Sequence, residues 1–432
     1  MPRARTSSIR ARAVRGSSRR AFVAGASLAL AGCGRAVGGG RQRATLWFAY
    51  GGKNREVLLS LVARFNASQA RYQVTPTYQG DYFECLAKTR TAIYAGVAPT
   101  FTHVVGEVRP YLAGAGVLEP LDDYPGASTL GLVPALSQRG SYTGADDQPL
   151  WAVPFNRSTP LLYCNAAALD AAALSPPESW DELVAAASRL TTRDGAHTTR
   201  WGYEVPIDWW FFCASLAQAG GSLLDATGSL SLGGDAGARA LRLWQRLIHD
   251  ERSMRPPPGR DYNAWQATNQ DFLAGRAAMV CTSTAFLRYM EENARFSVRA
   301  ARLAGLVRRA VPTGGTFFTV LRGAPPAEKE AAWAFLRFMC ETPQAIEWAT
   351  RTGYLPVTED AVATLRRSGH YERSPNDAVA QAQLGDAVGW PWSRELFRVQ
   401  REIVTPRLEA AVLQNLDAAR VIADARREAA AG

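Results

Sequence analysis

The segment 44–106 alternates between β-prone runs and runs with helical periodicity. Residues 44–50 (ATLWFAY) are apolar and rich in strand-forming residues, whereas 54–68 repeat apolar residues every three or four positions, as the buried face of a helix does. Further strands are expected at 72–80 and 100–106, with another helix starting at 81. Strands separated by helices pair in parallel, because each helix crosses back over the sheet. This pattern predicts an α/β domain with a mainly parallel sheet.

Two of the expected helices begin with capping signals. Asp81 is a candidate N-cap, and Ser179 is another, with Glu182 three residues later as a capping box requires. From there to position 290 the chain is expected to be largely helical. Further helices are expected at 328–353 and 392–404. The chain therefore changes near its middle from strand–helix alternation to mostly helix.

The N-terminus has the composition of an export signal. Residues 1–32 contain seven arginines and no acidic residue, and the apolar run 21–31 is shorter than the about 20 residues that cross a bilayer as a helix. Arg19 and Arg20 form a pair that resembles a twin-arginine signal. We expect the protein to be exported.

A cysteine follows the apolar run. The letters LAGC ending at Cys33 resemble a lipoprotein box, in which the cysteine is lipidated and becomes the new N-terminus. We expect 1–33 to be a signal peptide with a lipobox and 34–43 a flexible, glycine-rich tether. The protein would then be anchored to the membrane by lipid, on the periplasmic or extracellular side. The alternative is an ordinary signal peptide in which Cys33 has no role.

The charge balance argues against a nucleic-acid partner. The formal net charge is +10, but removing the seven arginines of residues 1–32 leaves +3. A basic excess confined to a signal leaves no electrostatic footprint for phosphate backbones. The roughly 400 residues that remain exceed what one core usually spans, so we expect two domains.

Cysteine and histidine are too scattered for a metal site. Besides Cys33 there are five cysteines, far apart and without a C-x-x-C motif, and the four histidines are also far apart. Zinc and thiol redox sites need close pairs of ligands. We therefore expect no metal, no cofactor and buried free thiols, with one disulfide as the alternative.

Several stretches resemble, in order, the extracellular solute-binding proteins of bacterial ABC importers, specifically the sn-glycerol-3-phosphate-binding branch. They include PFNRSTPLLY at 154–163, FLAGRAAM at 272–279 and TGYLPVT at 352–358. With further matches they extend from about residue 45 to residue 408. The resemblance implies an α/β, two-lobe periplasmic-binding-protein-like fold of type II, with the ligand held between the lobes.

The resemblance also implies where the lobes begin and end. The N-lobe would comprise 44–153 and 315–352, and the C-lobe 158–312 and 354–432. Three hinge segments would cross between them. Proline and glycine occur in all three, which suits segments that must turn.

A glycerol phosphate needs two kinds of partner. Its phosphate is bound by guanidinium, hydroxyl and backbone N–H donors, while its hydroxyls need an acceptor and its carbons an aromatic wall. The resemblance assigns the phosphate to Tyr82, Ser283, Gly315, Tyr354 and Arg401. It assigns the glycerol part to Glu107, Ser158 and Trp209.

Each assignment has a structural alternative. Arg401, in a chain so rich in arginine, could be a solvated helix residue, and the two tyrosines half-buried aromatics. Glu107 could be a surface acid, although it follows an apolar strand whose end would face the ligand in an open α/β sheet. Thr284 competes with Ser283, and Trp210 with Trp209.

Three functions are compatible with the sequence. The first is a monomeric lipoprotein that captures sn-glycerol 3-phosphate, or a glycerophosphodiester such as glycerophosphocholine, and delivers it to the permease subunits of an ABC importer without chemistry. The alternative is a binding protein of the same fold for a neutral sugar or oligosaccharide, which the twelve tryptophans favour. A phosphodiester hydrolase ranks last, because no G-x-S-x-G, H-E-x-x-H or clustered Asp/His set is present.

Overall fold

The computed structural model describes residues 40–137, 149–225, 229–256, 259 and 261–431. The expected signal peptide, with Arg19, Arg20 and Cys33, and most of the expected tether lie outside the described residues. From Arg41 onward the chain is one compact unit. Within its described part, no helix combines the length and the apolar character needed to span a bilayer.

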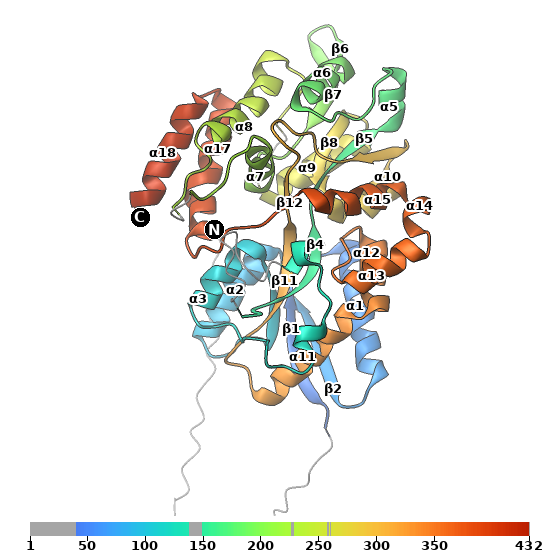
Figure 1. The fold of residues 1–432 in the computed structure, drawn as a ribbon, viewed down its shortest axis with the longest axis vertical. Coiled ribbons are helices and arrows are strands. Elements are labelled where there is room, and N and C mark those ends of the chain that lie inside the picture. Colours follow the sequence, from blue (N-terminus) through green and yellow to red (C-terminus); the bar gives the residue numbers. More distant parts are fainter. Residues whose placement is uncertain (1–39, 138–148, 226–228, 257–258, 260, 432) are drawn as a thin grey trace, which may run out of the picture. The chain divides into compact units, whose positions relative to one another are not determined.

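Two five-stranded sheets organise this unit (Figure 1). The first contains, in spatial order, β2 (Tyr72–Tyr78), β1 (Gln42–Phe48), β3 (Phe101–Val105), β11 (Gly314–Val320) and β4 (Val153–Ser158). As predicted, β1 is parallel to both β2 and β3. However, β11 is antiparallel to β3 and β4, so the sheet is mixed and the expectation of a mainly parallel sheet is wrong at this edge.

Helices cover both faces of the first sheet, because its side chains alternate between the faces. Phe101 contributes to the core beneath α1, α11 and α12, whereas Val104, three residues further along β3, contributes to the core beneath α2 and α3. The helices and turns around this sheet are α1 (Gly52–Ser68), α2 (Tyr82–Tyr94), η1 (Gly106–Val108), α3 (Arg109–Gly114), η2 (Ala127–Thr129), α4 (Pro134–Ser137), α11 (Pro326–Cys340) and α12 (Thr342–Thr352).

The second sheet contains, in spatial order, β6 (Thr192–Asp194), β7 (His197–Glu204), β8 (Ala277–Ser283), β5 (Pro160–Asn165) and β9 (Val298–Ala301). The expectation of a largely helical segment between 180 and 290 is therefore wrong at three stretches, because β6, β7 and β8 lie within it. All seven residues of β8 are buried, so this strand shows no alternation of polar and apolar residues that would distinguish it from a buried helix.

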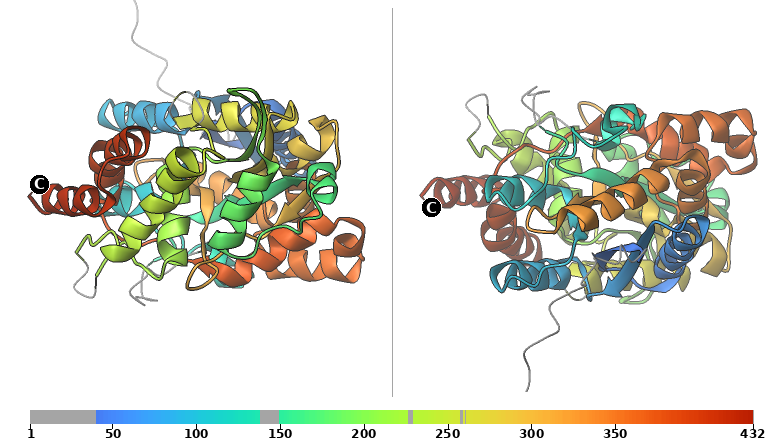
Figure 2. Two further views of the ribbon diagram at one scale, coloured as in Figure 1. Left: turned by 90° about the horizontal axis from the view of Figure 1, so that it is seen from above. Right: turned by 90° about the horizontal axis from the view of Figure 1, so that it is seen from below.

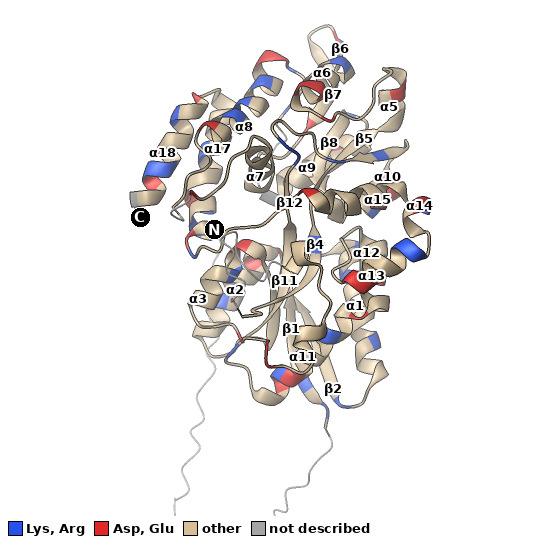
Figure 3. Cartoon of the chain, in the orientation of Figure 1, with Lys and Arg blue, Asp and Glu red and all other residues tan. Residues whose placement is uncertain are grey.

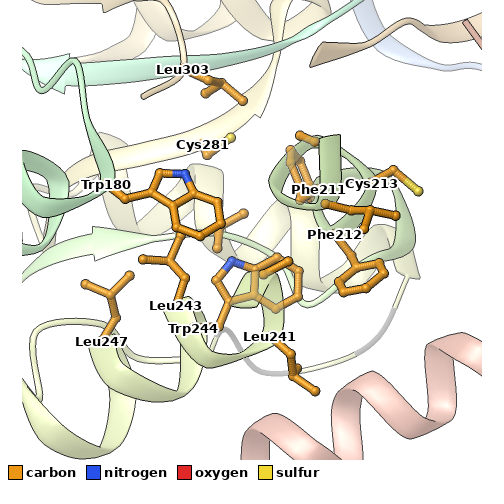
Figure 4. Packing of buried hydrophobic residues seen from close by; sticks show 14 of the residues in the cluster. Trp180, Phe211, Phe212, Cys213, Leu241, Leu243, Trp244, Leu247, Cys281 and Leu303 are labelled. Carbon is orange, nitrogen blue, oxygen red and sulfur yellow. The ribbon is translucent and has the colours of Figure 1, made fainter. Parts of the chain in front are cut away.

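The second sheet is also covered on both faces. Leu162 and Cys164 of β5 face a core that includes Trp180, Phe212 and Trp244, while Leu161 and Tyr163 face the other core. Figure 4 shows the first of these cores, with the two indoles packed between neighbouring helices. The helices and turns around this sheet are α5 (Ala166–Ala171), α6 (Trp180–Leu190), α7 (Trp209–Gln218), α8 (Asp235–Gln245), η3 (Arg246–Asp250), α9 (Asp261–Leu273), η4 (Thr284–Phe286) and α10 (Leu287–Asn293).

The remaining elements contact the surroundings of both sheets. A short parallel pair joins β10 (Val311–Pro312) to β12 (Ala387–Val388). The other elements are α13 (Glu359–Arg367), α14 (His370–Arg373), α15 (Pro375–Ala382), η5 (Gln383–Asp386), α16 (Leu396–Arg398), η6 (Val399–Val404), α17 (Thr405–Gln414) and α18 (Ala418–Ala431). Both views of Figure 2 show α17 and α18 beside α8, where the Gln245 amide donates to the Ala411 carbonyl at 3.0 Å.

The predicted caps form, with one difference. Asp81 accepts from the backbone of α2 and completes a capping box with Glu84. Ser179 accepts from the Glu182 N–H at 3.2 Å, but the Glu182 carboxylate accepts from the Glu178 N–H instead of the cap's own. The second cap is therefore confirmed, whereas its box is not.

Two further expectations have clear outcomes. The first strand begins at Gln42, so it includes the last two residues of the expected tether. The five cysteines among the described residues are buried and free, which confirms the expected thiols and excludes a disulfide between them. They are Cys85, Cys164, Cys213, Cys281 and Cys340.

Candidate functional site

Tyr82 and Tyr354 meet where α2 begins and α12 has just ended. Their phenol oxygens lie 3.4 Å apart. Both accept hydrogen bonds from the side-chain nitrogen of Asn156 in β4, at 3.1 Å and 3.3 Å. Tyr354 is nearly buried and stacks on Trp348, with ring centres 5.6 Å apart and planes 13° from parallel. The structure therefore brings two of the predicted phosphate-binding residues together around an asparagine that the sequence analysis did not single out.

A second layer of polar groups supports this pair. The Asn156 oxygen accepts from the Thr316 backbone N–H at 2.8 Å and from the Thr316 hydroxyl, which is also 3.3 Å from His103 Nδ1. Burial lowers the pKa of His103 from 6.5 to about 3, so the imidazole is neutral. The Tyr82 ring contacts this imidazole edge-on, at 5.6 Å between centres.

Gly315 lies beside the same cluster, at an irregularity in the pairing of β11 with β4. Its φ of +82° is a conformation that L-residues with a side chain rarely adopt. A β-carbon added here would be 1.7 Å from the backbone carbonyl oxygen of Asn156. Glycine is thus required for β11 to approach β4 at this point.

Arg401, from the C-terminal part of the chain, lies over Phe83 at the start of α2. Its guanidinium carbon lies 4.0 Å from the centre of the Phe83 ring, and Phe83 directly follows Tyr82. Phe397, in α16, stacks on the same phenylalanine at 6.1 Å between ring centres. The contact of a guanidinium with an aromatic face holds this half-buried side chain near the start of α2.

Glu107 belongs to a second cluster, of charged side chains, together with Arg109 and Arg157. The guanidinium carbons of Arg109 and Arg157 lie 3.6 Å and 4.2 Å from the centre of the Phe317 ring. Burial lowers the pKa of each arginine to about 9.

Glu107, in η1, interacts electrostatically with Asp208, which directly precedes α7. Loss of hydration raises the pKa of this half-buried carboxyl, and the nearby Asp208 raises it further, while Arg157 and Arg109 oppose the rise. Asp208 is the N-cap of α7 and accepts from the Trp210 N–H at 2.8 Å. The carboxylates at 107 and 208 therefore repel each other, and the two arginines reduce that repulsion.

Trp209 is only 1% exposed and stacks on Trp390, with 6.3 Å between ring centres and 19° between planes. Trp390 in turn donates to the Thr313 carbonyl at 2.6 Å. Trp210 stacks on Trp265 and lies against Gly314, where an added β-carbon would be 2.4 Å from the indole. Of the two candidate tryptophans, Trp210 is the one that contacts the neighbour of Gly315.

The three candidates with a hydroxyl group, Ser158, Ser283 and Thr284, interact with the backbone in different ways. Ser158 is buried at the end of β4 and pairs with Gly314. Ser283 caps η4 by accepting from the Ala285 N–H at 3.1 Å, which gives it a structural role. Its competitor Thr284 is fully buried, and its hydroxyl oxygen accepts from the Thr159 N–H at 3.4 Å.

The predicted residues therefore fall into separate groups. Direct contacts link Tyr82 to Tyr354, and Gly315 and Arg401 each touch an immediate neighbour of this pair or its asparagine. Glu107, Trp209 and Ser283 make their contacts elsewhere. Asn156 was missed from the sequence, although it begins a polar run, NRST, between the apolar stretches WAVPF and PLLYC, which was a usable signal.

One internal cavity lies in the core of Figure 4, away from these residues. It has a volume of about 30 Å³ and is lined mainly by apolar side chains, among them Trp180, Phe211 and Trp244. That volume has room for water but is far below the about 300–1,000 Å³ that small-molecule sites usually span. We interpret it as a packing gap.

Acidic and basic side chains are mixed on the described helices, without a large region of a single sign (Figure 3). Figure 3 shows acidic and basic positions interspersed along the helices around both sheets. Many are paired, as Arg64 is with Glu347 at 2.7 Å and Lys329 with Glu119 at 2.9 Å. Within the same residues, no group of three His, Cys, Asp or Glu side chains has an arrangement that could hold a metal ion.

Sequence comparison relates the chain to proteins that bind solutes outside the cell. Residues 60–378 match the family of bacterial extracellular solute-binding proteins. The sn-glycerol-3-phosphate-binding periplasmic protein UgpB of Escherichia coli K12 is 25% identical over 382 residues, which cover 84% of this chain and 86% of that protein. The UgpB of Pectobacterium atrosepticum is also 25% identical, over 82% of this chain and 83% of its own.

Comparison with solved structures confirms the fold. UgpB from Mycobacterium tuberculosis, in complex with glycerophosphocholine, matches with a TM-score of 0.79 and 24% identity, over 90% of this chain and 98% of that one. An ABC substrate-binding protein from Listeria monocytogenes, in complex with cycloalternan, matches with a TM-score of 0.77 and 20% identity, over 90% and 97%. The predicted periplasmic-binding-protein-like fold is confirmed, and the chain belongs to the bacterial extracellular solute-binding proteins, the non-enzymatic solute-capturing components of ABC transporters.

Proposed function

We propose that this protein captures sn-glycerol 3-phosphate, or a glycerophosphodiester such as glycerophosphocholine, and delivers it to the membrane subunits of an ABC importer. The observation that carries the proposal is the meeting of the Tyr82 and Tyr354 hydroxyls on Asn156. Two phenols at this spacing suit a single acceptor group such as a phosphate, whose oxygens can accept from both.

Arg401 would supply the positive charge in this proposal. Its guanidinium lies over Phe83, one residue from Tyr82, so a short movement of its long side chain would bring it to the same ligand. Gly315 would contribute its backbone N–H, since the absence of a side chain lets a ligand approach closely. Hydrogen bonds between an oxyanion and a guanidinium are about twice as strong as those between neutral groups.

The relatives favour a phosphoester. The curated proteins that match are named for sn-glycerol 3-phosphate, and the Mycobacterium tuberculosis structure contains glycerophosphocholine. We propose that Glu107 and Ser158 contact the glycerol part and that Trp209, or its neighbour Trp210, forms an aromatic wall. Ser283 or Thr284 would complete the phosphate contacts.

A neutral sugar or oligosaccharide is the second candidate. The observation that favours it is the pair of indole stacks, Trp209 on Trp390 and Trp210 on Trp265, because sugars bind well against indoles. Structures with a bound oligosaccharide also match this fold nearly as well as the phosphodiester complex does.

We propose that the ligand closes two lobes, with the N-lobe at 44–153 and 315–352 and the C-lobe at 158–312 and 354–432. Contacts between the proposed lobes support this, since Lys53 pairs with Glu292 and Phe83 stacks on Phe397. These contacts would separate in the open state, and a ligand that touches both lobes would favour closure.

We further propose that a twin-arginine signal exports the monomeric protein and that a lipid on Cys33 anchors it. Metabolic labelling with a fatty acid tests the anchor, with Cys33→Ser as the variant. Label on the parent chain and none on the variant is expected, whereas an unlabelled parent chain would exclude the anchor.

Titration calorimetry of the purified chain with glycerol 3-phosphate, glycerophosphocholine and maltose tests the ligand. Heat from either phosphoester and none from maltose is the expected result. Binding of maltose alone would favour the sugar alternative. As a check on the site, Arg401→Ala should weaken phosphoester binding, while Arg420→Ala, at an exposed position of α18, should not.

A further inference from the structure

We infer that Asn156 is a positioning residue that makes Tyr82 and Tyr354 hydrogen-bond donors toward the ligand, and so selects a group that only accepts. This inference rests on the proposed function and deepens it. Asn156 is fully buried in β4, so it acts through the tyrosines. The neutral amide of Asn156 would thus give the site its preference for an oxyanion.

The orientation of the Asn156 amide is determined by its partners. Its oxygen accepts from the Thr316 backbone N–H at 2.8 Å, and a backbone N–H can only donate. The Thr316 hydroxyl also bonds this oxygen. The amide nitrogen must therefore be the atom that faces the two phenols.

An amide nitrogen donates and does not accept. In its bonds of 3.1 Å to Tyr82 and 3.3 Å to Tyr354, the phenol oxygen is consequently the acceptor in both cases. Neither bond uses the phenol's own hydrogen. The 3.4 Å contact between the phenols can use the hydrogen of only one of them, and an acceptor that replaces this contact would receive the hydrogens of both.

The surroundings keep this arrangement neutral. His103 lies behind Thr316 and against the Tyr82 ring, and it is uncharged because it is buried. Burial also raises the pKa of Tyr354 well above its usual range, so its phenol keeps its hydrogen. Two phenol donors fit a phosphate or another oxyanion, whereas a sugar hydroxyl would have to turn its own hydrogen away.

Binding to the wild-type chain comes first, measured by calorimetry with glycerol 3-phosphate, glycerophosphocholine and maltose. If neither phosphoester binds, the proposed function fails, and the inference about Asn156 fails with it. If one binds, that compound is the probe for a cycle of variants, in which the inference can fail while the proposed function stands.

The cycle combines Asn156→Leu with the double change Tyr82→Phe/Tyr354→Phe. Leucine has the same branched arrangement of four side-chain heavy atoms as asparagine, but neither a donor nor an acceptor. With both tyrosines present, N156L should weaken binding about 10-fold or more, the usual effect of losing oriented bonds to a charged ligand. In the phenylalanine background, the same change should weaken binding no more than about 2-fold.

A structural role for Asn156 would predict equal losses in both backgrounds, so equal losses overturn the inference. Near-UV circular dichroism of each variant checks that it folds. If N156L does not fold, Thr316→Val replaces it in the cycle, because valine removes the hydroxyl that bonds the Asn156 oxygen. A loss that depends on the tyrosines is again expected, and equal losses again contradict it.

Discussion

The phenol oxygens of Tyr82 and Tyr354, 272 positions apart in the sequence, lie 3.4 Å from each other. Replacing either tyrosine by phenylalanine should weaken binding of the phosphoester about 5- to 50-fold, because one bond to a charged group is lost. Titration calorimetry measures the effect. Tyr94→Phe is the matched control, since that side chain is 96% exposed, and it should leave the affinity unchanged. Unaltered affinity in Y354F would remove this residue from the site.

Gly315→Ala should destabilise the fold. The alanine would have to adopt a φ near +82°, and its β-carbon would be 1.7 Å from a backbone oxygen, so β4 and β11 must separate. We expect a loss of about 2 kcal/mol or more in the free energy of unfolding, measured with urea. Gly323→Ala serves as the control, because nothing lies within 4 Å of its β-carbon. A variant as stable as the parent would contradict the close approach.

His103 should make the protein less stable in acid. Its pKa is about 3 in the folded chain, because it is buried, and 6.5 when unperturbed. Between these pH values the unfolded chain holds a proton that the native state lacks, so stability falls as the pH drops below 6.5. The loss approaches roughly 4 kcal/mol near pH 3.

The variant His103→Gln does not titrate in this range. The difference in unfolding free energy between the parent and this variant should therefore shrink below pH 6.5 and stay constant above it. Urea unfolding between pH 4 and 8 measures this difference. A difference that is flat across the whole range would show that the imidazole can be protonated in the folded state.

Glu204 should have the opposite effect. Burial raises its pKa from 4.5 to about 7, although Arg255 at 3.4 Å opposes the rise. The native state then holds a proton that the unfolded chain loses first, so stability is greatest below pH 4.5 and falls as the pH rises toward 7. The fall is on the order of 3 kcal/mol, and E204Q should lack it. An equal pH dependence in the parent and in E204Q would contradict the raised pKa.

The order of the elements from β1 to β3 followed from local pattern alone. The repeat of apolar residues over 54–68 predicted α1, and Asp81 marked the start of α2, because both signals depend only on neighbours in the chain. The pairing of the strands could not be predicted in the same way. That β11 inserts antiparallel between β3 and β4 depends on contacts between segments more than 150 residues apart.

The strands of the second sheet were overlooked for a different reason. β8 is buried on both faces, so its residues are uniformly apolar and carry no period of two. In β7 the first five residues are exposed or half-buried, so no apolar face stands out. Helices on both sides of the sheet hide the pattern that would have identified these strands.

Local sequence pattern was enough to predict the strand–helix order from β1 to β3, the two caps and the buried thiols, and the resemblance gave the family and its fold. Contacts between distant parts of the chain set which way the Asn156 amide faces and hold Arg401 over Phe83. Capping and hydrophobic periodicity involve residues that are close together in the sequence, so both can be recognised from the sequence. The direction of a hydrogen bond is set by partners that only folding brings within 3 Å, such as Thr316 beside Asn156.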